Sequence, residues 1–388
     1  MTPRKSNVPK STEPKPAEPA APAPDLASAA RAFAIEGEFL SAEPWGSGHI
    51  HDTYRATFGR AIFDYFGAPT CCILQSINTH IFRNLATLME NIQRVTAHLA
   101  AQVAGIPDRG RRVLTLIPTR DGHAWFTDAD GHAWRAYRFI ANAHTVDQVG
   151  SPAQAFEAAR AFGLFQQQLA GLPAPHLHDT IPNFHHTPTR FAALEDAIAR
   201  DAAGRAHDSG PEIAFALARK SIAAALLNAG LPERATHNDT KINNVLFDDN
   251  DQDGEALCVI DLDTVMPGLA PYDFGDMVRT MTCPAAEDER DLAQVRIHFP
   301  LFEAVARGYL STAGSFLTPA EKDALVLAGK LITFETGIRF LADHLNGDTY
   351  FKVHREGHNL DRCRTQFALV ASIEEQEGAM QRLMRSIG

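Results

Sequence analysis

Residues 236–248 read THNDTKINNVLFD, a segment in which polar side chains give way abruptly to an apolar run. Asp239 is a carboxylate that could accept a proton from a hydroxyl group, and Lys241 adds a cation two residues later. Asn244 supplies an amide oxygen just before the apolar residues 245–247. A base, a cation and an oxygen ligand at this spacing suit a loop that moves a proton and binds an anion. The alternative is an ordinary turn, since Asn, Asp and Thr favour turns in any case.

The chain beyond this loop predicts a β-hairpin. Two short apolar runs, residues 245–247 and 257–260, are separated by turn residues, a pattern typical of a hairpin with a longer loop. In an antiparallel hairpin, the start of the first strand lies beside the end of the second strand. We therefore expect Asn244 to lie beside Asp261, with Asp239 in the same corner. Amide and carboxylate oxygens suit Mg²⁺, so Asn244 and Asp261 are the predicted metal ligands.

The composition excludes several classes of protein. The 388 residues are 45% hydrophobic, which suits about two to three domains or one large two-lobed enzyme. A net charge of −11 argues against general nucleic-acid binding and against anionic membrane surfaces. No apolar run reaches the length of a transmembrane helix, about 18 residues, and the N-terminus lacks a signal-peptide core. Five cysteines without a CxxC pair indicate reduced thiols, so we expect a cytoplasmic protein without nucleic-acid or membrane partners.

The apolar patterns predict an α+β fold with two lobes. Residues 1–25, rich in proline and alanine, are expected to be a disordered tail. Residues 26–142 read as a small β-rich lobe with one helix at 86–102, and residues 143–388 as a larger, mainly helical lobe. The predicted strands of the first lobe include residues 71–78, 111–119 and 131–140. The predicted helices of the second lobe include residues 152–169, 212–230 and 319–345.

The ordered set of motifs resembles the protein-kinase-like fold, and within it the aminoglycoside phosphotransferase group of small-molecule kinases. The pattern His237-x-Asp239-x-Lys241-x-x-Asn244, the hairpin and Asp261 resemble the catalytic and metal-binding loops of that fold. Five stretches are further similar to bacterial N-acetylhexosamine 1-kinases. They read GSGHI, ILQSIN with LMENI, HNDTKINNVLFD, VIDLDTVMPG and TGIRFLADHLNGDTYF. The resemblance covers about residues 36–375 and implies transfer of phosphate from ATP, with Mg²⁺, to the anomeric hydroxyl of an N-acetylhexosamine.

The resemblance implies a role for each candidate residue. Asp239 would take the proton of the acceptor hydroxyl, Lys241 would reach the γ-phosphate, and Asn244 and Asp261 would hold Mg²⁺. The nucleotide would be bound by a glycine-rich turn, the third strand and a hinge segment: Gly46, Ser47, Gly48, Gln75, Phe139 and Ile140. The sugar acceptor would be bound by His49, Arg339 and Tyr350. Lys241 could instead be a solvated loop residue, and Arg339 could instead form a salt bridge to Glu335 or Asp343, four residues away on a helix.

One departure from the kinase pattern keeps a rival function open. Related kinases carry a lysine on the third strand, paired with a helix glutamate. Gln75 stands at that position here, and Glu90 in the predicted helix is the expected glutamate. A nucleotide-binding pseudokinase is therefore an alternative, although the complete set of Asp239, Asn244 and Asp261 argues against it.

Two further alternatives concern ligands other than an N-acetylhexosamine. The acceptor could be another small hydroxylated molecule, such as an aminoglycoside or choline. The chain could also bind a metal through a histidine-rich loop, which contains His176, His178, His185 and His186. No acidic or cysteine ligands stand at metal-site spacing around these histidines, so a polar loop is the expectation there.

Overall fold

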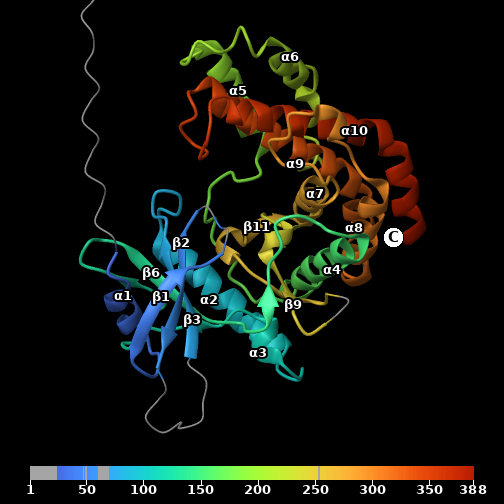
Figure 1. Cartoon of the computed structure of the whole chain (residues 1–388). Coiled ribbons are helices and arrows are strands. Elements are labelled where there is room, and N and C mark those ends of the chain that lie inside the picture. Colours follow the sequence, from blue (N-terminus) through green and yellow to red (C-terminus); the bar gives the residue numbers. More distant parts are fainter. Residues whose placement is uncertain (1–23, 47, 49, 60–69, 252–253) are drawn as a thin grey trace, which may run out of the picture.

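The computed structural model describes residues 24–46, 48, 50–59, 70–251 and 254–388, and Figure 1 shows their arrangement. A lobe built around an antiparallel sheet comes first, and a larger, mainly helical lobe follows it. This is the α+β, kinase-like architecture that the sequence predicts. Of the predicted tail, only residues 24 and 25 fall within the described part of the chain.

The N-terminal lobe contains a twisted antiparallel sheet with the order β1-β2-β3-β6-β4, and β5 also pairs with β6. On β3 the buried side chains of Cys72 and Leu74 alternate with less buried residues, whereas β6 is buried along almost its whole length. Gln75 on β3 lies directly opposite Arg135 on β6. The strands are β1 (Phe39–Pro44), β2 (Asp52–Phe58), β3 (Thr70–Ile77), β4 (Leu116–Ile117), β5 (Phe126–Thr127) and β6 (Ala133–Arg138).

The predicted helix of this lobe is α2 (Leu85–Gln102). Asn84 begins it by accepting a hydrogen bond from the backbone N–H of Thr87 at 3.3 Å. The apolar stripe of α2 is buried and belongs to a core that also contains Leu262 and Val265 from the second lobe. The helix therefore packs against the segment that follows Asp261, which couples the two lobes beside the candidate site.

Two short helices join α2 in this lobe, α1 (Leu26–Ala32) and α3 (Arg109–Arg112). The prediction of a strand over 111–119 was wrong at its start. Arg111 and Arg112 lie in or at the end of α3, and their guanidinium groups bond to Asp248 and Glu255 of the hairpin. These charge pairs connect α3 to the hairpin, and within residues 111–119 only β4 is a strand.

The C-terminal lobe is a set of packed helices that includes the predicted helices at 152–169 and 319–345. Close packing of α4 on α8 is possible because Gly308 leaves room where a Cβ atom would lie 2.2 Å from the carbonyl oxygen of Phe156. The helices are α4 (Pro152–Leu169), α5 (Thr187–Arg200), α6 (Gly210–Ala218), α7 (Ala270–Met281), α8 (Phe299–Ala313), α9 (Pro319–Leu345) and α10 (His358–Ile387). None of the helices in the described ranges is long and apolar enough to span a membrane.

The prediction of one helix over 212–230 was wrong in its second half. Helix α6 ends at Ala218, and short 3₁₀ turns follow at Lys220–Ile222 and Leu227–Ala229. At the break, the guanidinium group of Arg219 bonds to Glu374 on α10. Tertiary contacts of this kind override the helix propensity of the alanine-rich sequence.

Two small sheets carry the candidate catalytic residues. The predicted hairpin forms from β9 (Val245–Asp248) and β10 (Ala256–Val259), and β7 (Ala143–His144) pairs with β9. A second pair, β8 (Glu233–Thr236) and β11 (Met266–Leu269), flanks the hairpin. Residues 237–244 connect β8 to β9, and residues 260–265 connect β10 to β11, so the two segments that contain the candidate catalytic residues lie at one corner.

Candidate active site

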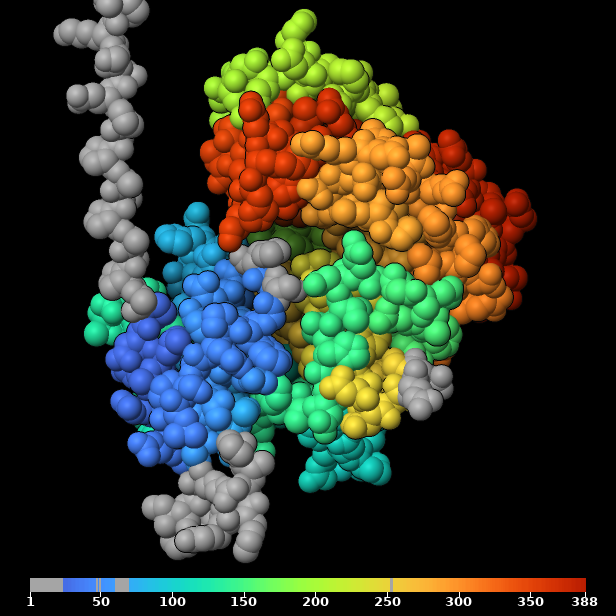
Figure 2. Space-filling model, viewed as in Figure 1, coloured from blue at the N-terminus to red at the C-terminus, as the bar shows by residue number. Residues whose placement is uncertain are grey.

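A cavity of about 260 Å³ lies between the two lobes. Figure 2 shows a hollow between the blue first lobe and the green and yellow start of the second lobe. The cavity brings together predicted residues that are far apart in the sequence. They are Gly46, Gly48, Gln75, Phe139, Ile140, Lys241, Asn244 and Asp261. The predicted residues Ser47 and His49 lie outside the described part of the chain, and Arg339 and Tyr350 do not line this cavity.

The loop before β9 is held in place by Asp273 in the first turn of α7. The carboxylate of Asp273 accepts hydrogen bonds from the backbone N–H groups of His237 at 2.9 Å and Asn238 at 2.7 Å. The hydroxyl group of Thr240 donates to the carbonyl oxygen of Asp273 at 2.6 Å. His237 bonds through Nε2 to the carbonyl oxygen of Ile260 at 3.0 Å. The loop backbone is therefore fixed from both sides, a requirement for precise placement of Asp239.

Asp239 lies between a cation and an amide. Its Oδ2 atom is 3.2 Å from Nζ of Lys241 and accepts a hydrogen bond from Nδ2 of Asn244 at 3.1 Å. Burial opposes ionisation of Asp239, but Lys241 and His237 hold its pKa below the usual value. Asp239 in turn raises the pKa of Lys241. The pair is thus a carboxylate and an ammonium group at neutral pH. Because Lys241 pairs with Asp239, it is not the fully solvated loop residue of the alternative interpretation.

The hairpin places Asp261 beside Asn244, as the antiparallel register predicts. Val245 pairs with Val259, and the N–H of Ile260 donates to the carbonyl oxygen of Asn244 at 2.9 Å. Asp261 has φ +60°, a left-handed conformation that is uncommon outside glycine. Burial, followed by the charges of Asp263 and Asp239, raises the pKa of Asp261 well above its usual value. The crowded carboxylates are a setting that a bound cation would stabilise.

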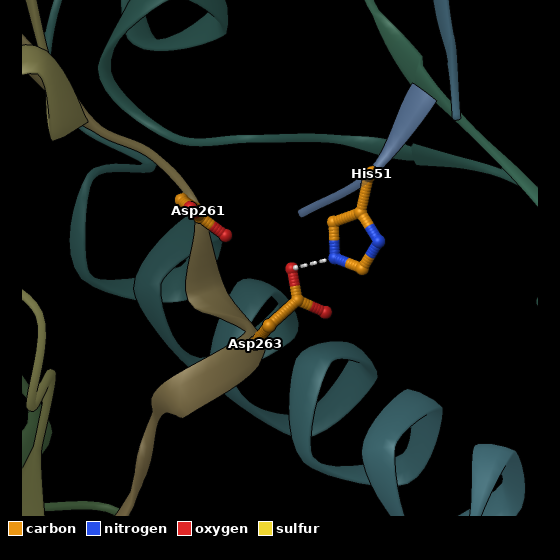
Figure 3. Close-up of side chains that lie close together, drawn as sticks. All are labelled: His51, Asp261 and Asp263. Carbon is orange, nitrogen blue, oxygen red and sulfur yellow. Dashed lines mark hydrogen bonds and ion pairs between the residues drawn. The ribbon is translucent and has the colours of Figure 1, made fainter. Parts of the chain in front are cut away.

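A second acidic residue, Asp263, is buried behind Asp261. Its carboxylate receives two hydrogen bonds from Arg135, at 2.5 and 2.6 Å, and lies 3.2 Å from Nε2 of His51. Figure 3 shows the side chains of His51, Asp261 and Asp263 extending into one space. Burial opposes the charge of Asp263, but Arg135 and then His51 hold its pKa well below the usual range. Sequence reasoning missed both Arg135 and His51.

Glu90 does not face the cavity. It pairs with His178 at 3.0 Å on the surface, and its neighbour Asn91 is the buried residue of that turn. The Asn91 amide donates to the carbonyl oxygens of His178 and Val265. The strand–helix ion pair of related kinases is therefore not seen in the described ranges, and Asn91 instead connects α2 to the second lobe.

The histidine-rich loop has a structural role around His185. Its Nδ1 atom lies 2.8 Å from Oε1 of Glu335 on α9, and its Nε2 atom lies 2.9 Å from the carbonyl oxygen of Asn238. This buried ring connects α9 to the residue before Asp239. Nothing in the sequence separates His185 from the exposed His176 of the same loop. Among the described residues, the histidines of this loop form no group of potential metal ligands.

Arg339 lies next to this connection on α9. Its guanidinium carbon is 5.6 Å from the ring centre of Phe184 and 5.5 Å from that of Phe351. The alternative of a salt bridge is not seen in the described ranges, since Glu335 bonds to His185 and Asp343 accepts backbone N–H groups of the following loop. An arginine between two aromatic rings keeps N–H donors free for a ligand.

Tyr350 is 60% exposed and contacts Phe351 edge to face. A second arginine, Arg190, stands near Arg339 and was not predicted. Burial, and then the charge of Arg339, lowers the pKa of Arg190. Arg190 donates to the carbonyl oxygen of Phe184 at 3.1 Å. Two cations, two phenylalanines and an exposed tyrosine therefore gather around Arg339 on α9.

Comparison with known proteins finds similarity to phosphotransferases. The model of the phosphotransferase enzyme family (APH) matches residues 41–308. The structure is similar to that of a microcompartment-associated aminopropanol kinase, with a TM-score of 0.53 and 17% identity over 92% of this chain and 97% of that one. It is also similar to amicoumacin kinase in complex with AMP-PNP, Ca²⁺ and Ami, with a TM-score of 0.58 and 13% identity over 90% and 92%.

A third similar structure is spectinomycin phosphotransferase in complex with ADP and spectinomycin, with a TM-score of 0.51 and 13% identity over 87% and 94% of the two chains. At these identities, the likeness to solved structures establishes the fold, whereas the family match covers more than half of the chain. The chain belongs to the phosphotransferase enzyme family.

Proposed function

We propose that the protein is an ATP- and Mg²⁺-dependent small-molecule kinase that phosphorylates the anomeric hydroxyl of an N-acetylhexosamine, GlcNAc or GalNAc. The observation that carries the proposal is the corner formed by Asp239, Lys241, Asn244 and Asp261 at the edge of the interlobe cavity. A cation and two oxygen ligands that line a cavity, with a base next to the cation, are the parts that phosphoryl transfer requires.

The cavity suits a nucleotide. Phe139 and Ile140 line it where the chain passes from β6 toward the second lobe, and the glycine turn at Gly46 and Gly48 lines another wall. The backbone of such a hinge can read a purine base, and the backbone N–H groups of a glycine turn can contact phosphates. Similar structures contain ADP or AMP-PNP, which supports a nucleotide in this cavity.

The metal ligands fit Mg²⁺ by their chemistry. The amide nitrogen of Asn244 is engaged with Asp239, which leaves the amide oxygen of Asn244 available as a ligand. Asp261 supplies a carboxylate whose pKa is raised by burial and then by the negative charges of Asp263 and Asp239. Asn244 and Asp261 would hold the ion, and Mg²⁺ in such a site neutralises charge on the phosphates.

The residues of the catalytic loop would act on the acceptor and the phosphoryl group. Asp239 is ionised, so it can orient the acceptor hydroxyl and accept its proton. Lys241, which lines the cavity beside Asp239, would contact the γ-phosphate. A hemiacetal hydroxyl is more acidic than an ordinary alcohol, so a carboxylate without a stronger base nearby suffices for transfer to O1.

The acceptor would bind on the α9 side of the loop. Arg339 and Tyr350 would hold the N-acetyl sugar, and His49 remains a candidate outside the described residues. His185 couples Glu335, one turn before Arg339, to the backbone beside Asp239. The two neighbouring arginines disfavour cationic acceptors such as choline or an aminoglycoside, because like charges repel in a partly buried site.

The proposal is tested with purified protein, Mg-ATP and a panel of reducing sugars, aminoglycosides and choline, with ADP release as the signal. We expect turnover with GlcNAc or GalNAc that stops when Mg²⁺ is chelated. Turnover only with an aminoglycoside or choline would show that the acceptor is that compound and not an N-acetylhexosamine. Binding of ATP without turnover across the whole panel would favour the pseudokinase alternative.

A further inference from the structure

A buried arginine, Arg135, lines the interlobe cavity from strand β6. Its side chain is 1% exposed, whereas the other cations of this wall are more open: Lys241 is paired with Asp239, and Arg138 stands at the exposed end of the strand. Burying a guanidinium group is costly unless its donors are satisfied. The hydrogen-bond partners of Arg135 therefore explain how its buried positive charge is stabilised beside the cavity.

Three of its donors have protein partners. The Nε–H of Arg135 donates to Oε1 of Gln75 at 2.9 Å, and its two terminal nitrogens donate to the two carboxylate oxygens of Asp263. A guanidinium group carries five N–H donors. The remaining two have no partner among the described residues, although the side chain borders the cavity.

Gln75 and Asp263 together fix the orientation of this group. The amide nitrogen of Gln75 donates to the hydroxyl group of Thr53 at 3.0 Å, so both ends of the Gln75 amide are engaged. His51 accepts the backbone N–H of Asn78 through Nδ1, which leaves its Nε2 to donate to Asp263. The surroundings therefore prevent Arg135 from turning away from the cavity.

We propose that Arg135 binds a phosphate group of the nucleotide, positioned by Gln75 and Asp263. This inference rests on the proposed nucleotide-dependent function and deepens it. The strand position that carries a lysine in related kinases holds Gln75, and its cross-strand partner Arg135 supplies the cation instead. Each terminal nitrogen of Arg135 keeps one N–H beyond its bond to Asp263, and a charged N–H donor suits a phosphate oxygen.

The rival explanation is that Arg135 only ties the two lobes together through Asp263. The two roles differ in their dependence on the ligand. Loss of a phosphate contact weakens the binding of ADP but not of adenosine, which has no phosphate. Loss of a connection between the lobes weakens the binding of both ligands alike. Calorimetric titration of Mg²⁺-free ADP and of adenosine into the full chain separates them.

The proposal predicts that Arg135→Gln weakens ADP binding by about ten- to a hundredfold, the range for one lost hydrogen-bonded charge, and leaves adenosine binding unchanged. The double variant Gln75→Lys/Arg135→Gln moves the cation to the neighbouring strand, so it should recover part of the ADP affinity. Arg219→Gln is the control, because it also removes a bidentate arginine–carboxylate pair, with Glu374, outside the cavity.

Equal affinities of the wild type and Arg135→Gln for ADP, or equal losses for ADP and adenosine, would overturn the proposal. If Arg135→Gln fails to fold, Arg135→Lys keeps the charge and is titrated in its place. A selective loss of ADP affinity then supports the phosphate contact, and a parallel loss for both ligands refutes it. A wild type that binds ADP but phosphorylates no sugar would overturn only the proposed acceptor, whereas one that binds neither ligand would overturn both proposals.

Discussion

Replacing Asp239 by Asn should remove the base while leaving the nucleotide site in place. An asparagine can keep a hydrogen bond with Asn244, but it cannot accept the proton of the acceptor hydroxyl. Loss of a positioned general base costs about 10²- to 10⁴-fold in rate, which corresponds to roughly 3–5 kcal/mol of activation free energy. We therefore expect Asp239→Asn to lower kcat by at least about a hundredfold.

The structure also predicts what this substitution leaves unchanged. Asp239 is not among the residues that line the interlobe cavity, so the affinity for ATP should change little. The fold should persist, because removing the charge relieves the repulsion of Asp261, and the hydrogen bonds that the backbone N–H groups of His237 and Asn238 donate to Asp273 remain.

The assay is initial-rate kinetics of ADP release at saturating sugar, with ATP affinity measured separately by calorimetry and folding checked by thermal melting. Asp249→Asn is the matched control, since it makes the same chemical change at a half-exposed carboxylate of the β9–β10 loop. A folded Asp239→Asn protein that keeps more than about a tenth of the wild-type kcat would refute the role of a base.

Other predictions concern binding, pH and packing. Arg339→Ala and Tyr350→Phe should raise KM for the sugar more than they lower kcat, because they supply binding energy common to the ground state and the transition state; the opposite split in steady-state kinetics would argue against a binding role. Glu335 raises the pKa of His185 above 6.5 against the effect of burial, so the stability from this pair is fully present below 6.5 and is lost as pH rises through the raised value. Urea unfolding at several pH values should show this decline in the wild type and not in His185→Ala. The substitution should itself lower the free energy of unfolding by about 3 kcal/mol at pH 6, because it leaves the buried charge of Glu335 unpaired. Identical pH profiles of the two proteins would contradict the role of this pair. Gly308→Ala should destabilise the α4–α8 contact by about 1–3 kcal/mol, and an unchanged midpoint of chemical denaturation would show that the helices can separate at little cost.

The position of Asn244 beside Asp261 was predictable because it follows from local pattern and strand register. A hairpin is specified by the polar loop, the two apolar runs and the turn between them. Antiparallel pairing then places Asn244 beside Asp261, independently of the more distant parts of the chain. The helices at 152–169 and 319–345 were predictable for a similar reason, since their apolar spacing and N-terminal caps are local signals.

The residues that complete the site were not predictable from local signals. Arg135 has the one available clue, a charge within an otherwise buried strand, but its partner Asp263 is 128 positions away. His185 stands among three other histidines of one loop, and its contacts with Glu335 and Asn238 join three distant segments. Glu90 was matched to a motif glutamate, whereas the helix buries Asn91 and turns Glu90 toward His178. One residue of rotation on a helix changes the face by about 100°.

The acceptor position is tested most directly by comparing a free N-acetylhexosamine with its methyl glycoside, which is blocked at O1. With Mg-ATP and the wild-type protein, the proposed function predicts ADP release with the free sugar, a sugar 1-phosphate as the product in phosphorus NMR, and no turnover of the methyl glycoside. Phosphorylation of the methyl glycoside at the same rate as the free sugar would contradict transfer to the anomeric hydroxyl, even though the chain remains a phosphotransferase by family.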